Sequence, residues 1–390
     1  MTSPLIPGGT STGSKRPAAF VGDLAAEGFP RRMTRSSGAR LWDDTGREYL
    51  DYVMALGAVT LGYAHPEVVS AARQAVADGA VGSLAPVVEG SLAQLLVECV
   101  PGIERVRFLK TGAEAVAAAV RAARVATGRD RVVTCGYHGW LDWCQNEPGV
   151  PRAVTELAAT VAFNDGAALQ QAVGGSDPVA AVVVEPVVEG YPDPSWLTLL
   201  RTECDAAGAV LVFDEIKTGF RLAVGGAAER FGVVPDLVVL GKGLANGFPL
   251  AAVGGSLGAT EAFDRTWISS TLATEQVSLA AAHATVTVSR RDGVPGRLRE
   301  SGGRLLEGLA GLARRHSRLG GIVRGVPEMC YVAFPRREVA WRVTAGMAGK
   351  GVLWKPSAYN FVSLAHTDDD IECTLGALDE VLGSVSQGDP

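Results

Sequence analysis

The chain has 390 residues and a formal net charge of −6, from 36 basic and 42 acidic residues. Its basic residues are scattered, so it lacks the basic stripe that nucleic-acid binding requires. With 47% hydrophobic and 20% charged residues, the composition is that of a soluble globular protein. Its longest apolar stretches are far shorter than the ~20 residues that span a membrane. We therefore expect no nucleic-acid partner and no membrane partner.

The six cysteines are irregularly spaced and form no CxxC pair. The N-terminus lacks the charged start and the apolar core of a signal peptide. These features predict reduced thiols and a cytoplasmic location. Cys135, His138 and Cys144 have an alternative interpretation as metal ligands, but their spacing fits no common site, so we predict no metal.

The chain begins with an arm rich in Gly, Ser, Thr and Pro, over residues 1–20. Apolar residues then alternate on both sides of Asp44-Thr45-Gly46, which predicts a β-hairpin over residues 39–53. Pro66 suits the first turn of a helix and Gly79 suits its end, so a helix is predicted between them.

The central part alternates short β-like runs with longer helical patterns. Runs of Val, Ile and Leu without alternation suit strands that are covered on both faces. The succession of strands and helices favours an α/β fold with a mostly parallel, doubly wound sheet. The predicted strands are 106–109, 132–135, 180–186, 209–215, 236–242 and 250–255, with helices at 114–127 and 195–207.

A long helical pattern over residues 275–291 leads into a smaller α+β region. This region mixes helices at 297–317, 336–350 and 368–383 with strands at 322–324, 329–334 and 361–364. We predict an N-terminal arm and part of a small domain over residues 1–45, a large domain over 46–275, and a linking helix with the C-terminal small domain over 276–390.

Ligands of an open parallel sheet bind outside the carboxyl ends of its strands. Five consecutive predicted strands end in functional side chains or in glycine, and this convergence predicts one site. The residues at these ends are Lys110 to Glu114, Gly136 to Gly139, Glu185-Pro186, Asp214-Glu215 and Gly241 to Gly243.

Three of these ends suggest a chemistry. Thr111-Gly112-Ala113 precedes a helix, where free amides, the positive helix end and the Thr hydroxyl would bind a phosphate. Asp214 ends an apolar strand, where a protonated pyridine nitrogen would be a partner for its carboxylate. Lys242 lies between two glycines, and a partly desolvated lysine can form a Schiff base with an aldehyde. Each also has an ordinary interpretation: a helix start, a salt-bridged or capping Asp, and a surface Lys.

Other catalytic motifs of the sequence are missing or out of context. No GxxxxGK[ST] phosphate loop occurs, and no GxGxxG follows the first strands. GxSxG occurs at Gly9–Gly13 and Gly254–Gly258, but the first follows no strand and the second has no evident His and acid partners.

In this order, the motifs resemble those of class III aminotransferases, which depend on pyridoxal phosphate (PLP) and have fold type I. The similarity is greatest to the branch that contains glutamate-1-semialdehyde 2,1-aminomutase, and it covers nearly the whole chain. It implies a large domain with a mostly parallel seven-stranded sheet and a smaller α+β domain. The matching segments are ARLWDDTGREYLDYV, LGYAHPEVV, RFLKTGAEAVAAAVRAAR, CGYHGWLDW, VVVEPV, VFDEIKTGFR, GKGLANGFPLAAVGG, SSTLATEQVSLAAA and SLAHTDDDI.

The resemblance implies a role for each residue around the cofactor. Lys242 would bind PLP as a Schiff base and shuttle the proton of the reaction. Asp214 would pair with the pyridine nitrogen. Tyr137 would stack on the ring beside His138, and Glu185 would lie near the cofactor rim.

The resemblance also implies that two subunits bind each phosphate. The amides of Gly112 and Ala113, helped by Thr111, would bind it within one subunit. Thr271 would reach the phosphate of the neighbouring subunit's cofactor, which implies a homodimer with shared active sites.

Several features bear on the substrate. The segment His138–Pro151 is short, which reduces the loop that covers the substrate in the aminomutase and weakens the aminomutase interpretation. Lys110 and Lys217 stand where uncharged residues are more usual, so they either bind an acidic substrate or are solvated.

Three further residues are candidates for substrate binding. Lys15 and Arg16 lie in an arm that resembles the segment with a carboxylate-binding arginine. Glu189 follows Glu185-Pro186 at one residue less than the spacing of the gating glutamate in ω-amino-acid aminotransferases.

We therefore predict a PLP-dependent aminotransferase that moves an amino group from an amino donor to a keto or aldehyde acceptor through Lys242. One alternative is an aminomutase, which moves an amine along one carbon skeleton. Another is a PLP-binding scaffold without catalysis, against which the intact Lys242–Asp214 pair speaks. A decarboxylase or a racemase on the same fold is a further alternative.

Overall fold

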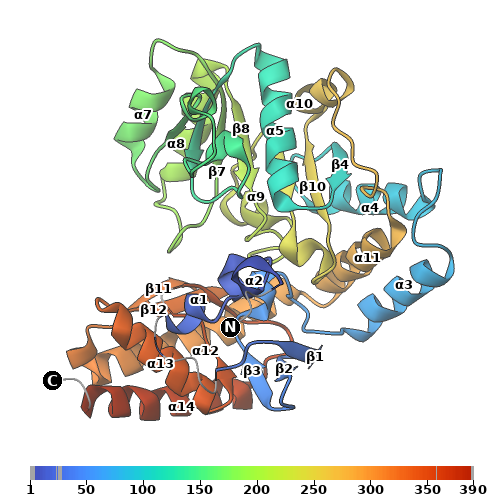
Figure 1. The fold of residues 1–390 in the computed structure, drawn as a ribbon. Coiled ribbons are helices and arrows are strands. Elements are labelled where there is room, and N and C mark those ends of the chain that lie inside the picture. Colours follow the sequence, from blue (N-terminus) through green and yellow to red (C-terminus); the bar gives the residue numbers. More distant parts are fainter. Residues whose placement is uncertain (1–4, 23, 25–28, 357, 388–390) are drawn as a thin grey trace. The chain divides into compact units, whose positions relative to one another are not determined.

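A computed structural model describes residues 5–22, 24, 29–356 and 358–387. The chain divides into two compact units, coloured along the sequence in Figure 1. Unit 1 consists of Met1–His65 and Arg297–Pro390, and unit 2 consists of Pro66–Gly296.

Both expected domain boundaries fall inside these units rather than between them, because two elements pair beyond the expected limits. Strand β3 (Glu48–Asp51) pairs with β2 (Arg40–Asp43) and with β13 (Val352–Leu353), so it belongs to unit 1. Helix α11 (Gln276–Arg291) packs against α3 (Pro66–Ala77), so it belongs to unit 2.

Unit 2 is built on a seven-stranded sheet of order β4-β10-β9-β8-β7-β5-β6. Strand β10 runs antiparallel to its neighbours β4 and β9, and the other pairs are parallel. The prediction of a mostly parallel seven-stranded sheet is therefore confirmed. The strands are β4 (Arg105–Leu109), β5 (Arg131–Cys135), β6 (Ala158–Thr160), β7 (Val179–Val184), β8 (Val210–Asp214), β9 (Leu237–Leu240) and β10 (Ala251–Gly255).

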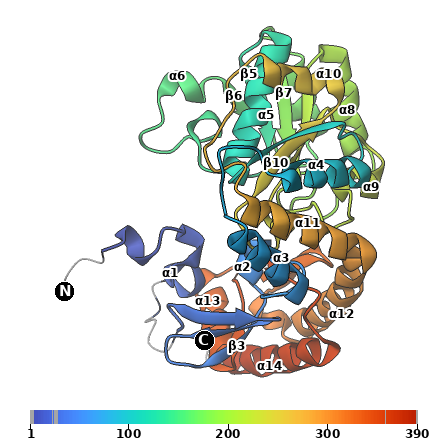
Figure 2. The same ribbon diagram turned by 90° about the vertical axis from the view of Figure 1, so that its right-hand side faces the viewer.

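Helices cover both faces of this sheet, which explains the continuous apolar runs in its strands (Figures 1 and 2). Alternate residues of β7 show the two faces: Val183 packs in the core under α5, while Val182 and Val184 pack in the core under α7 and α8. A third core joins the sheet to α4 and α11. These helices are α4 (Val87–Cys99), α5 (Gly112–Thr127), α7 (Gly166–Val173) and α8 (Trp196–Ala207).

Shorter helices complete unit 2: α6 (Arg152–Thr155), α9 (Gly226–Phe231) and α10 (Leu257–Thr260). Helices α3 and α11 lie side by side in Figure 2 and pack against each other. Throughout the described ranges, every helix is too short or too polar to cross a lipid bilayer.

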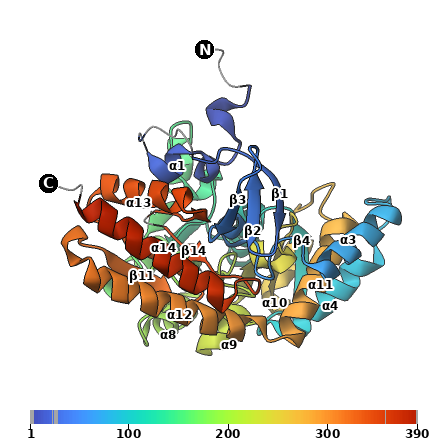
Figure 3. The ribbon, with the colours of Figure 1, turned by 90° about the horizontal axis from the view of Figure 1, so that it is seen from below.

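Unit 1 combines two small sheets with long helices, which is the smaller α+β fold that was predicted (Figure 3). One sheet has the order β1-β2-β3-β13 and the other the order β11-β12-β14. Helix α13 packs along α14. The remaining elements are α1 (Ala18–Val21), β1 (Met33–Ser37), α2 (Met54–Gly57), α12 (Val294–Arg315, which enters from unit 2), β11 (Ile322–Val326), β12 (Met329–Ala333), α13 (Arg337–Gly349), β14 (Asn360–Phe361) and α14 (Asp368–Gln387).

The predicted N-terminal arm is held within unit 1 by a lysine, although its residues 1–4 lie outside the described part. Its 3₁₀ turns, Pro7–Gly9 and Gly13–Lys15, precede α1. Lys355 Nζ donates a hydrogen bond of 2.6 Å to the Ser14 carbonyl and lies 4.2 Å from the ring centre of Phe20. Burial lowers the pKa of Lys355 to about 8.

Candidate active site

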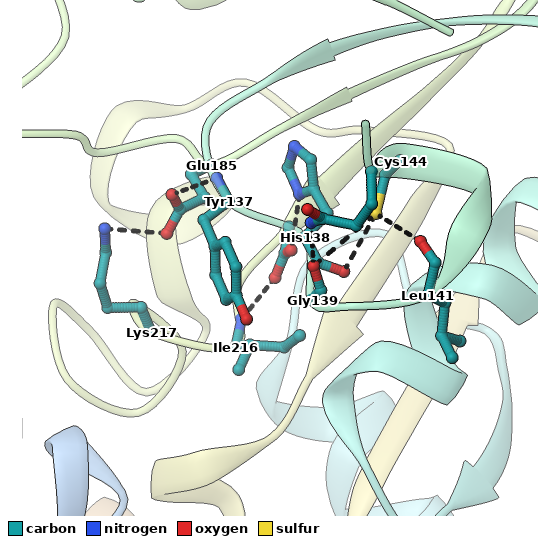
Figure 4. A network of polar contacts seen from close by, with 10 residues as sticks. Tyr137, His138, Gly139, Leu141, Cys144, Glu185, Ile216 and Lys217 are labelled. Carbon is teal, nitrogen blue, oxygen red and sulfur yellow. Dashed lines mark hydrogen bonds and ion pairs between the residues drawn. The ribbon is translucent and has the colours of Figure 1, made fainter. Parts of the chain in front are cut away.

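The strand ends that the sequence singled out meet at one edge of the unit 2 sheet. Strand β4 points the same way as β9 because both run antiparallel to β10. The carboxyl ends of β4, β5, β7, β8 and β9 therefore lie at the same edge. Figure 4 shows residues that follow three of them: Tyr137 and His138 after β5, Glu185 after β7, and Ile216 and Lys217 after β8.

Helix α5 begins directly after β4 with two unused amides. Thr111 and Glu114 form a capping box: the Thr111 hydroxyl accepts from the Glu114 amide at 3.2 Å, and the Glu114 carboxylate accepts from the Thr111 amide at 2.8 Å. The hydroxyl of Thr111 also donates to Glu114 at 3.0 Å. The amides of Gly112 and Ala113 have no acceptor in the described part of the chain, so they and the positive end of α5 can receive an anion.

The loop after β5 requires glycine on both sides of Tyr137-His138. Gly136 has φ +105°, and a Cβ there would lie 2.7 Å from Glu185 Oε2. Gly139 has φ +101°, and a Cβ there would lie 2.7 Å from the Cβ of Ala113. The loop thus fits closely between the end of β7 and the start of α5. Tyr137 is 67% exposed, so its ring is available to a ligand.

Asp214 is a buried carboxylate at the end of β8, bound by protein groups on both oxygens. His138 Nδ1 donates to Oδ2 at 2.8 Å, and the Ile216 amide donates to Oδ1 at 3.2 Å. His138 is also buried and stacks on Trp143 with ring centres 6.3 Å apart. A buried carboxylate is well suited to a cationic ligand group.

Glu185 and Lys217 form an ion pair next to this loop (Figure 4). The Lys217 amine lies 2.8 Å from Glu185 Oε1, and the two side chains are only 9% and 11% exposed. Glu185 Oε2 accepts a hydrogen bond of 2.9 Å from the Tyr137 amide. Lys217 is therefore largely enclosed and paired, so of its two interpretations the solvated one does not hold at this position.

Lys242 follows β9 and adopts an unusual backbone conformation. Its φ of +39° lies in a region that residues other than glycine rarely occupy and that is concentrated at functional sites. The residue is partly exposed, yet enclosure of its side chain lowers the pKa of the amine. The cations of Lys217 and Arg221 lower this pKa further, while the carboxylates of Glu185 and Asp214 raise it. A lysine with a lowered pKa is a better nucleophile near neutral pH.

A second ion pair lies beside the start of α5. The Lys110 amine lies 2.9 Å from Glu275 Oε1, and both side chains are 15% exposed, so Lys110 is also paired rather than solvated. Glu275 in addition caps α11, because it accepts from the Val277 amide at 2.7 Å. The pair ties the end of β4 to the segment that contains Thr271, whose side chain is exposed.

The three candidate substrate residues do not take part in these contacts of unit 2. Lys15 and Arg16 belong to unit 1 and are exposed. Glu189 is exposed in the loop after β7 and has φ +54°. Their roles stay predictions. In the ranges that the structure describes, no three His, Cys, Asp or Glu side chains are grouped to hold a metal ion.

Comparison with known proteins identifies the family. Residues 23–382 match the family described as Aminotransferase class-III. The chain belongs to this family. A relative from Thermomicrobium roseum, named glutamate-1-semialdehyde 2,1-aminomutase, is 36% identical over 397 residues, which cover 92% of this chain and 92% of the relative. The resemblance that the motifs indicated is therefore confirmed.

Two solved structures of similar proteins share the fold. The PLP internal aldimine form of the Sphingopyxis sp. MTA144 FumI protein has a TM-score of 0.92 at 29% identity, covering 98% of this chain and 94% of that one. An omega-transaminase from Sphaerobacter thermophilus has a TM-score of 0.84 at 29% identity, covering 91% of each chain. The chain is thus a class III enzyme of fold type I, and its cofactor is PLP.

The residues of unit 2 fit this cofactor by their chemistry. The unused amides of Gly112 and Ala113 suit a phosphate, and the buried carboxylate of Asp214 suits a protonated ring nitrogen. The Lys242 amine, with its lowered pKa, suits an aldehyde. The exposed Tyr137 ring suits the face of an aromatic ligand. These four features belong to one sheet edge, as the cofactor requires.

The sequence suggested candidate site residues but not how they are held. It did not indicate that His138 is hydrogen-bonded to Asp214; a place for His138 beside the ring stays a prediction. It also left open the partners of two lysines, which are Glu275 for Lys110 and Glu185 for Lys217. The available signal was the position of each lysine at a strand end, where a charge must find a partner.

Proposed function

We propose that this class III enzyme moves an amino group from an amino donor to a keto or aldehyde acceptor, with Lys242 as the residue that holds PLP. The observation that carries the proposal is the state of the Lys242 amine. It follows a strand at the ligand-binding edge, its backbone is strained, and enclosure and nearby cations lower its pKa. Such an amine attacks aldehydes and exchanges protons near neutral pH.

PLP, when bound, supplies an aldehyde that condenses with amines and a ring that withdraws electrons from the substrate carbon. Lys242 Nζ would link to this aldehyde, and after release it would take the proton from the substrate carbon and deliver it to C4′, the cofactor carbon that carried the aldehyde. Asp214 would keep the ring nitrogen protonated. His138, which donates to Asp214 Oδ2, would hold that carboxylate in one orientation.

The remaining cofactor contacts would come from the start of α5 and the loop after β5. The Gly112 and Ala113 amides would bind the phosphate. Thr111 would help only after its hydroxyl turns away from Glu114, to which it donates in this structure. Tyr137 would cover one ring face and exclude water from it, with Glu185 near the cofactor rim.

The active form is proposed to be a cytoplasmic homodimer in which Thr271 contributes to the partner subunit's cofactor site. Thr271 is exposed, and the same segment presents Trp267 at 82% and Leu272 at 50% exposure. Large exposed apolar side chains are typical of surfaces that a partner covers. The six cysteines are free, which supports a reducing compartment.

The substrate side of the site is proposed from the arm and the loop after β7. Lys15 or Arg16 would bind a substrate carboxylate, since both cations are exposed in the arm that Lys355 anchors. Glu189 would face the substrate from the exposed loop after β7.

The test is a donor screen with purified holoenzyme. Each amino donor is added with and without a keto acceptor, while the visible absorbance of the cofactor and the keto product of the donor are measured. We expect the absorbance to change with productive donors and one keto product to form per amine transferred. Turnover of a single substrate in the absence of any separate amino donor would exclude a transferase.

An aminomutase is the second candidate, and the name of the Thermomicrobium roseum relative favours it. Against it stands the short segment His138–Pro151, which folds back on itself through a hydrogen bond from the Gln145 amide group to the Gly139 carbonyl. An aminomutase must keep its intermediate behind a cover until the second half of the reaction. Conversion of an amino aldehyde without a separate donor would identify this activity.

A PLP-binding scaffold without catalysis is the third candidate. It would bind PLP through Lys242 but show no absorbance change with any amine. The same screen detects a decarboxylase by release of carbon dioxide and a racemase by loss of optical activity.

A further inference from the structure

The Lys217–Glu185 ion pair joins three of the strand ends at the proposed active site. Lys217 follows β8, Glu185 follows β7 and Tyr137 follows β5. The Lys217 amine lies 2.8 Å from Glu185 Oε1, and Glu185 Oε2 accepts from the Tyr137 amide at 2.9 Å (Figure 4). We propose that Lys217 is a positioning residue for the Lys242 reaction: it holds Glu185, and Glu185 holds the backbone of Tyr137. This inference rests on the proposed function, in which Tyr137 covers the cofactor ring.

The burial of the pair favours a role in geometry over a role in stability. Its side chains are 9% and 11% exposed, so both charges have lost most of their hydration. The desolvation cost of a buried ion pair offsets much of its attraction, whereas loss of one partner leaves an uncompensated charge. Each oxygen of Glu185 is bound to a different loop. The carboxylate therefore cannot turn without releasing Lys217 or Tyr137.

The loop after β5 is shaped around this carboxylate. Any side chain at position 136 would meet Glu185 Oε2, because a Cβ there would lie 2.7 Å away. Tyr137 itself is 67% exposed and therefore has limited packing of its own. The hydrogen bond from its amide to Glu185 is thus a principal restraint on the backbone position from which the ring extends.

The pair also acts on the Lys242 amine. The Lys217 cation lowers the pKa of Lys242 and the Glu185 carboxylate raises it. Arg221 acts in the same direction as Lys217, and Asp214 in the same direction as Glu185. Removal of Lys217 should therefore raise the pKa of the Lys242 amine, and removal of Glu185 should lower it. Removal of an ion pair remote from the site would change neither.

This pairing also bears on substrate choice. The Lys217 ammonium is already neutralised by Glu185, so a substrate carboxylate would have to share this ammonium with Glu185 or displace Glu185 from it. Displacement would also release the Tyr137 amide. We therefore assign Lys217 to the positioning of the loop and not to the recognition of acidic substrates.

The test uses Lys217→Met and Glu185→Gln in the dimer as purified, first without PLP. Lys242 is acylated over a range of pH, and its labelling is measured by mass spectrometry. We expect the half-maximal pH to rise in K217M and to fall in E185Q. Amide hydrogen exchange at Tyr137 should become at least about tenfold faster in both variants, because each weakens the bond to Glu185. Lys217→Arg keeps the positive charge and should leave both the labelling profile and the Tyr137 exchange at their wild-type values.

The holoenzyme supplies a third readout. In K217M we expect kcat to fall roughly tenfold while KM changes by less than about twofold, because the pair affects the reacting geometry more than substrate binding. Arg201→Met is the matched control: it removes the 3.0 Å ion pair with Asp236 in the same unit, away from the site. It should leave the Lys242 labelling profile and the Tyr137 exchange unchanged.

Two results would overturn the inference: K217M and E185Q shift the labelling profile in the same direction, or Tyr137 exchange stays at the wild-type rate in both. If K217M does not fold, E185Q alone tests the inference: its half-maximal pH must fall and its Tyr137 exchange must become faster, while K217R stays at the wild-type values. Failure of the proposed function is separable. In that case the wild-type holoenzyme transfers no amino group from any donor, although the labelling and exchange shifts of the variants are still observed.

Discussion

Asp214 and His138 are joined by a 2.8 Å hydrogen bond, with side chains that are 2% and 1% exposed. Asp214 ends β8 and His138 follows β5, and β7 lies between these strands in the sheet, so the contact reaches across a strand. His138 is fixed in turn by stacking on Trp143. The Asp214 carboxylate is therefore oriented before any ligand arrives, which lowers the reorganisation that a bound cation would demand.

Replacing His138 with Ala is expected to lower kcat by about tenfold to a hundredfold, because a hydrogen bond to a charged group contributes about 1.5–3 kcal/mol. PLP should still bind, since Lys242 and the start of α5 are unchanged. Asp214→Ala should also retain some PLP but lose most of the rate. Both are measured as kcat together with PLP bound per subunit, and a wild-type kcat in H138A would show that Asp214 needs no such support.

Lys242→Ala is expected to abolish the absorbance change on adding amines and to lower the rate by at least about 10²–10⁴, the usual contribution of a positioned proton-transfer group. Lys350→Ala serves as the control, because Lys350 is a half-exposed lysine of unit 1 that pairs with Glu380. Its steady-state rate should equal that of the wild type. Full activity in K242A would remove Lys242 from its proposed role.

Cofactor uptake should depend on pH through the Lys242 amine. Enclosure of the side chain and the nearby cations lower its pKa, so the neutral, reactive form appears at lower pH than for an ordinary lysine. We expect the rate of PLP uptake by the cofactor-free protein to rise with pH and to reach half its maximum below the usual lysine value of about 10.4. Stopped-flow absorbance measures this rate, and a midpoint at or above that value contradicts the assignment.

The sheet of unit 2 was largely predictable, because most of its strands are short apolar runs in the sequence. The six residues of β7 are all buried, and a short run of Val and Ala covered on both faces reads as a central strand. The direction of β10 was not predictable, since its apolar run is the same whichever way it runs. Helix α4 escaped prediction because Val87, Val88 and Gly90 at its start disfavour a helix and tertiary packing overrides them.

Candidate residues for the site could be proposed from the sequence, but their contacts could not. Lys242 and Asp214 were named from glycine flanks and from a carboxylate at a strand end. The partners were missed because they are distant in the sequence: Lys110 and Glu275 are 165 positions apart, and His138 and Asp214 are 76 apart. Strand order decides such pairs, and the order of strands is a tertiary property that local patterns do not contain.

Glu215 should make stability depend on pH. Burial is the main cause that raises its pKa to about 7, against hydrogen bonds from the Thr218 hydroxyl at 2.5 Å and the Ala227 amide at 2.6 Å. Because this pKa is higher in the folded state, protonation of Glu215 stabilises the folded protein. The stabilisation is fully present below the unfolded-state pKa of about 4.3 and is lost as the pH rises through about 7. Relative to Glu215→Gln, the wild type should therefore lose about 2 kcal/mol of unfolding free energy between pH 5 and pH 8.

Urea unfolding of both proteins at the two pH values measures this difference. Other titrating groups are common to the two proteins and cancel in the comparison. An equal difference at pH 5 and pH 8 would mean that Glu215 keeps an ordinary pKa in the folded state.

Thr271 and Lys242 are proposed to serve the same cofactor from different subunits, and heterodimers test this directly. Thr271→Ala alone should weaken PLP binding by about tenfold to a hundredfold, the loss of one hydrogen bond to a charged group. Lys242→Ala alone should be inactive. A heterodimer of one K242A chain and one T271A chain contains one site with both wild-type residues if the site is shared between subunits.

Heterodimers isolated through two different affinity tags should therefore bind PLP at half of their sites with wild-type affinity. Their kcat should be near half of the wild-type value per dimer, because the second site lacks both residues. If Thr271 instead serves its own subunit, no site in the heterodimer holds both residues, and PLP affinity stays at the T271A value. The second outcome would leave Lys242 in place and remove the shared active site.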